Sequence, residues 1–176
     1  YQISHNEIGE IIYIETLALY FLELEEKGAN NINLVSASHV IYPILKALKI
    51  ALNKGLNLPI VYNTNGYDTK ELLDCLDGIV DIYLPDLKYL FDDKAIKYSR
   101  AENYFNVSIK AIEIMKNQVG DLIVEKNKIA KNGIIIRHLI LPNNQSDSYD
   151  ILIELKERGF LKTTISLMSQ YNPEFR

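Results

Sequence analysis

The sequence predicts an α/β fold, a partial (β/α) barrel of the TIM type built on parallel strands. Five short apolar segments each end in a cluster of polar residues, and amphipathic helical patterns lie between them. Segments that are apolar along their length are typical of strands buried on both faces, as in parallel sheets covered by helices. The carboxyl ends of such strands are where (β/α) barrels place their functional groups. The expected strands lie within residues 33–39, 59–66, 80–88, 134–143 and 164–171.

The expected helices follow from apolar residues that recur at steps of three and four. Each pattern stops at or near a glycine, which commonly terminates a helix. Asp68 is the expected N-cap of the third helix, with Glu71 three residues later as its reciprocal partner, and Ser38 is an expected N-cap of the second. The helical patterns occupy residues 14–28, 40–55, 68–78, 107–120 and 152–159.

The alternation of helix and strand from residue 13 implies right-handed crossovers within a single domain, residues 1–176. Residues 121–132 interrupt this alternation and predict a small hairpin with a polar turn. Because the series opens with a helix, we expect the first strand of the barrel and the loop after it to be missing from this sequence. Residues 32–38 would then have an unpaired edge.

Composition argues against several classes of function. The 176 residues have a net charge of −4, whereas a nucleic-acid-binding protein usually presents a basic surface. No apolar run approaches the roughly 18 residues of a membrane-spanning helix. The only cysteine, Cys75, cannot form an internal disulfide, which suits a reducing cytoplasm. We therefore expect a cytoplasmic protein with neither a nucleic-acid partner nor a membrane.

Five segments in order, each at an expected strand end, resemble the radical S-adenosylmethionine (SAM) superfamily. Within it they are similar to the PflX-type branch, which is related to the pyruvate formate-lyase activating enzyme. The likeness covers nearly the whole chain. The segments are VYNTNGY at 61–67, GIVDIYLPDLKY at 78–89, QVGD at 118–121, IRHLILPNN at 136–144 and LMSQY at 167–171.

The resemblance implies an iron–sulfur enzyme that activates a glycyl-radical enzyme. In this superfamily three cysteines spaced C-x₃-C-x₂-C hold a [4Fe–4S] cluster, which cleaves SAM reductively to a 5′-deoxyadenosyl radical that abstracts hydrogen. The sequence contains none of these cysteines, so the cluster ligands are expected upstream and this chain alone is expected to be inactive. The implied partners are a glycyl-radical enzyme or another protein substrate, and a one-electron reductant.

The resemblance also implies a set of SAM-binding residues but no catalytic or metal-binding residue in this chain. Asn63 and Asn65 match the family's Asp-Thr-Asn-Gly stretch, whose side chains approach the ribose and the amino-acid part of SAM. Asp86 and Lys88 match its Asp-Leu-Lys; two residues apart on a strand, they face the same way and can bind the two charged ends of an amino acid. The expected cofactor-binding residues are Ser36, Ser38, Asn63, Asn65, Asp86, Lys88, Arg137, Leu139 and Gln170, with Tyr171 as the alternative to the last.

Other interpretations of the same residues stay open. Asp86 and Lys88 can form a purely structural ion pair, and Asn65 with the following glycine is a strong turn signal. Two other functions are a Schiff-base lyase that uses Lys88 as its nucleophile and a non-catalytic half-barrel that binds another protein. His138 has the opposite phase to its strand neighbours and is expected to face the core or the helices, whereas Cys75 is expected to be a buried helix residue.

Overall fold

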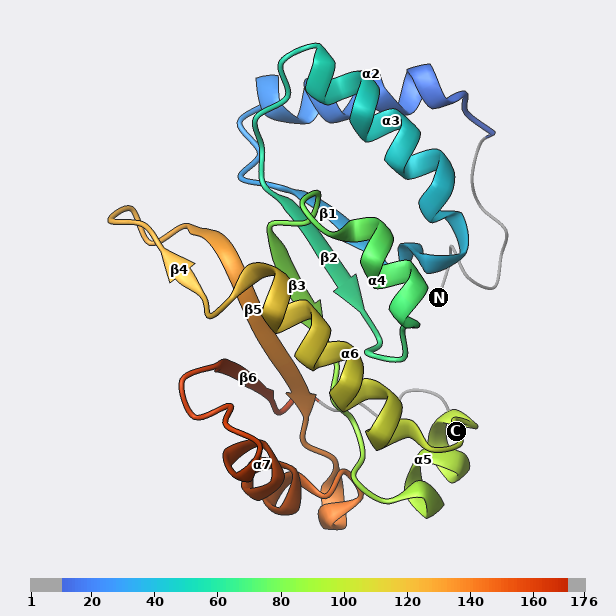
Figure 1. Ribbon diagram of the computed structural model, residues 1–176, viewed down its shortest axis with the longest axis vertical. Coiled ribbons are helices and arrows are strands. Elements are labelled where there is room, and N and C mark those ends of the chain that lie inside the picture. The colour runs from blue at the N-terminus through green and yellow to red at the C-terminus, as the bar shows by residue number, and fades with distance from the viewer. Residues whose placement is uncertain (1–10, 171–176) are drawn as a thin grey trace. The chain divides into compact units, whose positions relative to one another are not determined.

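Six strands form one sheet in the computed structural model, which describes residues 11–170 (Figure 1). The strand order is β1-β2-β3-β5-β4, and β6 also pairs with β5. The pairs β2–β3, β3–β5 and β5–β6 are parallel, which confirms the predicted α/β class with a mostly parallel sheet. In the described chain the sheet is open. The strands are β1 Ile32–Val35, β2 Ile60–Thr64, β3 Ile82–Pro85, β4 Ile123–Val124, β5 Ala130–Leu139 and β6 Thr164–Met168.

The helices separate the parallel strands in the predicted order, with one addition. The short helix α5 was not expected, because four of its eight residues are charged and it has no long apolar stripe. The α-helices are α2 Ile14–Glu26, α3 Ile41–Asn53, α4 Lys70–Leu76, α5 Asp92–Ser99, α6 Tyr104–Val119 and α7 Ser148–Glu157; the 3₁₀ turns are η1 Ala37–Val40 and η2 Pro142–Asn144.

The described residues divide into two compact units. The first contains residues 11–32 and 39–58, in which α2 packs against α3 and the Asn57 amide donates a hydrogen bond to a Glu25 carboxylate oxygen at 3.1 Å. The second contains residues 33–38 and 59–170, with most of the sheet and helices α4 to α7. The single domain expected over residues 1–176 stays a prediction. The candidate site lies within the second unit.

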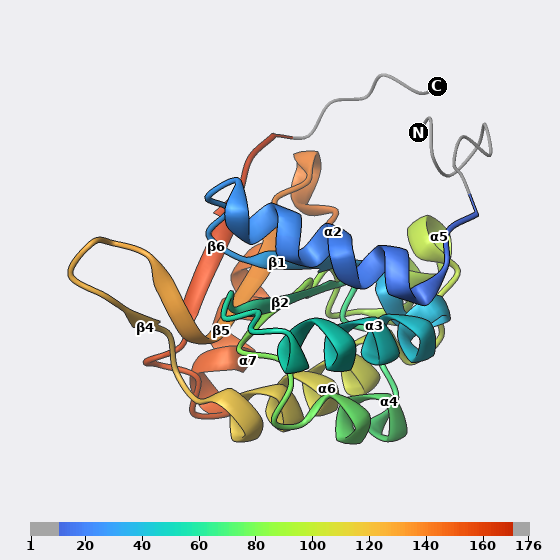
Figure 2. The same cartoon turned by 90° about the horizontal axis from the view of Figure 1, so that it is seen from above.

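One face of the sheet in the second unit is covered by helices. Helix α6 packs against β3, β5 and α4, and Figure 2 shows α4 and α6 on the same side of the sheet. Tyr62, Tyr83 and Ile134 are fully buried on this face, and the Tyr83 hydroxyl donates to Gln118 of α6 at 2.6 Å. Burial of a large apolar side chain contributes about 1.5–3 kcal/mol, so this layer is the core of the unit.

The opposite face of the same strands is only partly buried. Because side chains alternate along a strand, the next residues in each strand point away from the helix layer. Asn63 pairs with Leu84 in the β2–β3 register, and Asp86 forms a parallel bridge with Arg137. All four are intermediate in exposure. Burial of the strands on both faces, expected from their apolar composition, is therefore not complete in the described chain.

The predicted cap at Asp68 is wrong. Thr69 is the N-cap of α4, and its hydroxyl accepts a hydrogen bond from the Leu72 amide at 3.3 Å. Asp68 is instead buried, where its carboxylate accepts hydrogen bonds from the hydroxyls of Tyr62, at 3.0 Å, and Thr64. Burial raises the pKa of Asp68 above its usual value despite these two hydrogen bonds. Asp68 thus connects β2 to the loop before α4.

The predicted cap at Ser38 is also wrong. Ser38 lies inside the 3₁₀ turn η1, and α3 begins at Ile41 after Val40 without a side-chain cap. The turn follows Ser36, which has a φ of +50° directly after β1. No serine hydroxyl therefore caps α3.

The small hairpin predicted at residues 121–132 is confirmed. Strand β4 pairs antiparallel with the start of β5, with Ile123 opposite Asn132 (Figure 2). Gly133 allows this close pairing, because its φ is +121° and an added Cβ would lie 2.5 Å from the Leu122 Cα. Within residues 11–170, none of the helices is both long and apolar enough to cross a membrane.

Candidate functional site

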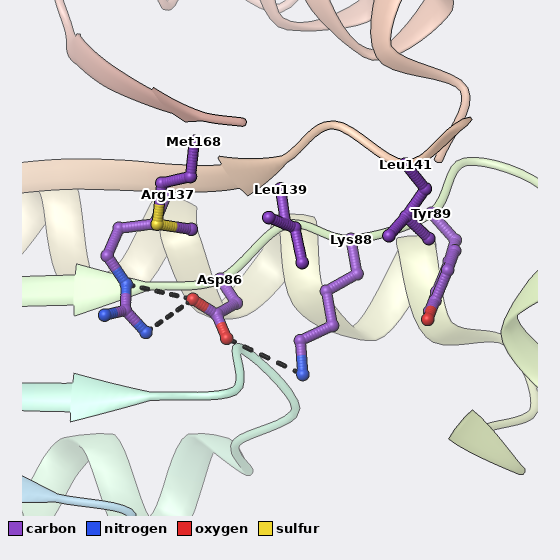
Figure 3. A pocket seen from close by; sticks show the side chains of 7 residues that line it. All are labelled: Asp86, Lys88, Tyr89, Arg137, Leu139, Leu141 and Met168. Carbon is purple, nitrogen blue, oxygen red and sulfur yellow. Dashed lines mark hydrogen bonds and ion pairs between the residues drawn. The ribbon is translucent and has the colours of Figure 1, made fainter. Parts of the chain in front are cut away.

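A pocket of about 270 Å³ opens at the carboxyl ends of β3, β5 and β6 (Figure 3). Pockets that enclose drug-sized ligands measure about 300–1,000 Å³, so this one is large enough for a small molecule or for part of a larger one. Three of its side chains are charged and four are apolar or aromatic. The lining residues are Asp86, Lys88, Tyr89, Arg137, Leu139, Leu141 and Met168.

Strand register brings the charged residues of this pocket together. Asp86 follows β3 directly and forms a parallel bridge with Arg137 of β5, and the Leu87 amide donates to the Arg137 carbonyl at 2.9 Å. Lys88 has the same phase as Asp86, and Leu139 has the same phase as Arg137. Leu139 pairs in turn with Met168 of β6. Four of the residues expected to bind the cofactor, Asp86, Lys88, Arg137 and Leu139, therefore do line one pocket.

A shared carboxylate links the two cations of the pocket. The Arg137 Nε and Nη2 donate to Asp86 Oδ1 at 2.9 and 2.6 Å, and the Lys88 Nζ lies 3.6 Å from Asp86 Oδ2. The side chains of Asp86, Arg137 and Lys88 are 18%, 27% and 35% exposed. All three charged groups are partly accessible to solvent, so a molecule in the pocket can contact them. The trio has a net charge of +1 and offers both an acceptor and two donors.

The rest of the pocket wall is apolar. Met168 lies beside Arg137, Leu139 lies between Asp86 and Lys88, and Leu141 and Tyr89 lie on the other side of Lys88 (Figure 3). A wall of this kind favours a hydrocarbon or a ring next to the charged end of a ligand. Sequence reasoning missed Tyr89, Leu141 and Met168, because nothing in an apolar strand end distinguishes a pocket wall from the core.

Tyr104, the first residue of α6, fixes the ends of β2 and β3. Its buried hydroxyl accepts from the Lys88 amide at 3.1 Å and lies within donating distance of the carbonyl oxygens of Asp86, at 3.1 Å, and Asn65, at 3.2 Å. Burial raises the pKa of Tyr104 well above its usual value, so the hydroxyl keeps its proton. Tyr104 is therefore a positioning residue for the pocket.

The other five expected cofactor-binding residues do not line this pocket. Ser36, Ser38 and Gln170 are exposed, and Asn63 is half-buried on β2. The Asn63 carbonyl accepts a hydrogen bond from the Ser36 amide at 2.9 Å, which connects the end of β1 to β2. Asn65 lines a second pocket nearby. Tyr171 lies outside the described residues.

Two further expectations concern His138 and Cys75. His138 is buried between the sheet and α7, where Nδ1 lies 2.6 Å from the Leu87 carbonyl oxygen and Nε2 lies 2.8 Å from the Ser148 hydroxyl. Its helix-facing position is confirmed. The expectation for Cys75 is wrong, since this residue is exposed on α4, on the side of the helix away from buried Leu73 and Leu76.

The donor set of the pocket suits the amino-acid end of SAM but not an iron–sulfur cluster. Asp86 can accept from an ammonium group, while Lys88 and Arg137 can donate to a carboxylate. A four-iron cluster needs several thiolates, and the sequence has one cysteine. Within the described ranges, no three His, Cys, Asp or Glu residues lie close enough together to hold a metal ion.

Comparisons with known proteins add one relative. The chain is 28% identical over 148 residues to an uncharacterized protein of Methanocaldococcus jannaschii. The alignment covers 84% of this chain and 39% of that protein, so the chain spans about two fifths of the relative's length. No family model matches the sequence. The name of this relative assigns it no activity.

Proposed function

We propose that this chain is the SAM-binding part of a radical SAM enzyme of the glycyl-radical-activating type. The observation that supports the proposal is the convergence of Asp86, Lys88 and Arg137 on one pocket with an apolar wall. These three residues come from the Asp-Leu-Lys and Arg-His-Leu segments on which the resemblance to the superfamily rests. Asp86 and Lys88 are close in the sequence, and the pairing of neighbouring parallel strands brings the distant Arg137 beside them.

In this proposal each residue has one task on SAM. Asp86 accepts hydrogen bonds from the ammonium group, and Arg137 and Lys88 bind the carboxylate. The apolar side chains of Leu139 and Met168 exclude water from the nucleoside end. When bound, SAM supplies the radical that abstracts hydrogen, while the protein binds and orients it.

The rest of the proposal concerns parts outside this sequence. We propose that the open sheet belongs to a partial (β/α) barrel and that residues outside this sequence hold the [4Fe–4S] cluster. A one-electron reductant and a glycyl-radical enzyme, or another protein substrate, would act on the whole protein in the cytoplasm. The relative, of which this chain spans 39%, is long enough to include such further elements.

The test is the binding of SAM, measured by isothermal titration calorimetry on the protein and on Asp86→Asn. We expect the substitution to weaken SAM binding by about tenfold or more, because a hydrogen bond to a charged group contributes about 1.5–3 kcal/mol. Asp74→Asn is the matched control, since Asp74 pairs with Lys70 at 2.5 Å on the exposed side of α4, away from the pocket. The control is expected to bind SAM as the unchanged protein does.

Two results would contradict the proposal. One is the absence of SAM binding at millimolar concentration, and the other is equal affinity in Asp86→Asn and Asp74→Asn when circular dichroism shows both folded. The codons of the gene upstream of Tyr1 provide an independent check of the superfamily. Three cysteines at the spacing C-x₃-C-x₂-C are expected there, and a complete upstream reading frame without them would exclude the cluster.

A further inference from the structure

A second pocket, of about 230 Å³, adjoins the first in the same unit. It lies where the loop after β2, the end of α5 and the start of α6 meet, and Lys88 lines both pockets. The resemblance to the superfamily implies contacts with SAM for Asn65 and Lys88 but assigns no ligand to Tyr67 or Arg100. The side chains that define it are Asn65, Tyr67, Lys88, Ser99, Arg100 and Tyr104.

The two charged side chains that line this second pocket are both positive. Lys88 and Arg100 line it, and no acidic side chain of the described chain does. Lys88 is 3.6 Å from Asp86, but the Arg100 guanidinium forms neither a hydrogen bond nor an ion pair with any residue between 11 and 170. Two cations in a pocket that no acidic side chain lines favour an anionic ligand there.

Arg100 ends α5 in a backbone conformation that is unfavourable for an arginine. Arg100 is the C-cap of α5 in the left-handed conformation, with φ +52° and ψ +34°, and its amide donates to the Ile96 carbonyl at 3.0 Å. Glycine is the residue that favours this conformation at a helix end. Arginine has no conformational advantage over glycine in this left-handed backbone, so its presence here is compatible with a role for its guanidinium.

A tyrosine provides a flat wall for the pocket. The Tyr67 ring is stacked on the buried Tyr104 ring, with centroids 6.1 Å apart and planes within 2°. Its hydroxyl donates to the Glu102 carbonyl at 2.9 Å, which fixes the ring, yet Tyr67 is 42% exposed. A planar group of a ligand can therefore stack on a ring that is already held in place.

We propose that this second pocket binds a small molecule in which a phosphate or a carboxylate is attached to a planar ring. The anionic group pairs with Arg100 and Lys88, and the ring lies against Tyr67. The two pockets share Lys88, but Arg100 and Tyr67 line only the second, so variants of these two residues test it separately from SAM binding.

The probes are phenyl phosphate and benzoate, with neutral benzyl alcohol for comparison. We expect both anions, but not the alcohol, to shift the amide resonances of Tyr67 and Ala101 in two-dimensional NMR spectra of the protein. Stronger binding of phenyl phosphate than of benzoate would identify phosphate as the recognised group, and the reverse would identify carboxylate. Absence of saturable shifts with both anions would overturn the proposal.

Arg100→Gly separates binding from folding. Glycine suits the left-handed backbone, so the variant is expected to melt at or above the temperature of the unchanged protein. Its affinity for the better anion is expected to fall about tenfold, as expected when a hydrogen bond to a charged group is lost. Its affinity for SAM is expected to stay the same, which keeps this test distinct from that of the first pocket.

Lys97→Gln is the matched control for Arg100→Gly. It removes one positive charge from the same helix, but Lys97 lies over the Tyr98 ring and does not line the pocket. We expect its affinity for the anion to change less than twofold. Equal loss of affinity in the two variants would show that general charge, and not a site at Arg100, attracts the anion, and would overturn the proposal.

Discussion

Replacement of Gly66 by alanine tests how the loop after β2 supports the first pocket. Gly66 has a φ of +80°, and an added Cβ would lie 2.1 Å from the Asp86 carbonyl oxygen, which belongs to the backbone. No flexible side chain can move aside to relieve that contact. The chain must therefore shift either the loop or the end of β3, where Asp86 contacts Arg137.

The magnitude follows from two costs. A residue with a Cβ in the left-handed region costs about 1–2 kcal/mol, and forcing extra atoms into a packed site costs about 1–3 kcal/mol more. The expected loss is about 2–5 kcal/mol, a large part of a typical free energy of unfolding of about 5–15 kcal/mol. Gly78→Ala is the matched control, because its φ is +70° and nothing lies within 4 Å of its added Cβ.

Urea unfolding followed by far-ultraviolet circular dichroism measures both variants. The Gly78→Ala variant should lose only the backbone cost, and Gly66→Ala should lose about 1–3 kcal/mol beyond that. Equal losses in the two variants would refute the claim that the loop is in close contact with the Asp86 backbone. We also expect the folded Gly66→Ala protein to bind any ligand of Asp86 more weakly than the unchanged protein does.

Three other predictions concern the same unit and the cluster. Tyr104→Phe leaves the Lys88 amide without its acceptor and should reduce the free energy of unfolding, measured by urea titration, by about 1–3 kcal/mol. An unchanged free energy would show that water replaces the hydroxyl. Asp121→Asn should destabilise the protein by about 0.5 kcal/mol at pH 7, the range of partly exposed pairs. Its carboxylate accepts from Thr163 at 2.9 Å and lies 3.2 Å from Lys116, which lowers its pKa, so this contribution is present at neutral pH and is lost as pH falls through that lowered value. Melting curves of the two proteins should therefore differ most at neutral pH, and the gap should narrow as the pH falls below the usual carboxyl pKa of 3.8; a gap that does not narrow in acid would count against this ion pair. Reconstitution with iron and sulfide should give no stoichiometric cluster by visible absorption, since one cysteine cannot hold four irons, and a full cluster would contradict that expectation.

The parallel strands and the polar residues at their carboxyl ends could be predicted from the sequence because both depend on simple rules. Parallel strands bring their carboxyl ends to one edge, and alternation along a strand gives Asp86 and Lys88 one direction. Burial of a charged side chain in an otherwise apolar strand is costly without a partner of opposite charge. Asp86 is that partner for Arg137. These residues could be placed without knowledge of any loop.

Other residues could not be placed, because their positions depend on tertiary contacts. A capping pattern fits Asp68 with Glu71 three residues later, but the hydroxyls of Tyr62 and Thr64 bind Asp68 in the core. The exposure of Cys75 depends on which side of a short helix faces the sheet. Short polar helices such as α5 have no apolar stripe long enough to recognise, so the residues that follow them, Arg100 among them, lack a predicted location.

The alternation along β5 gives the protein two separate sets of positions to vary. Ile134, Ile136 and His138 face the helices and are almost completely buried, whereas Arg137 and Leu139 face the partly open side. Changes at the first set disturb packing, while changes at the second set alter what the sheet can hold and leave its interior intact. Every second residue of β5 can therefore be substituted, by design or in evolution, to change what the partly open face binds. The residues in between maintain the fold.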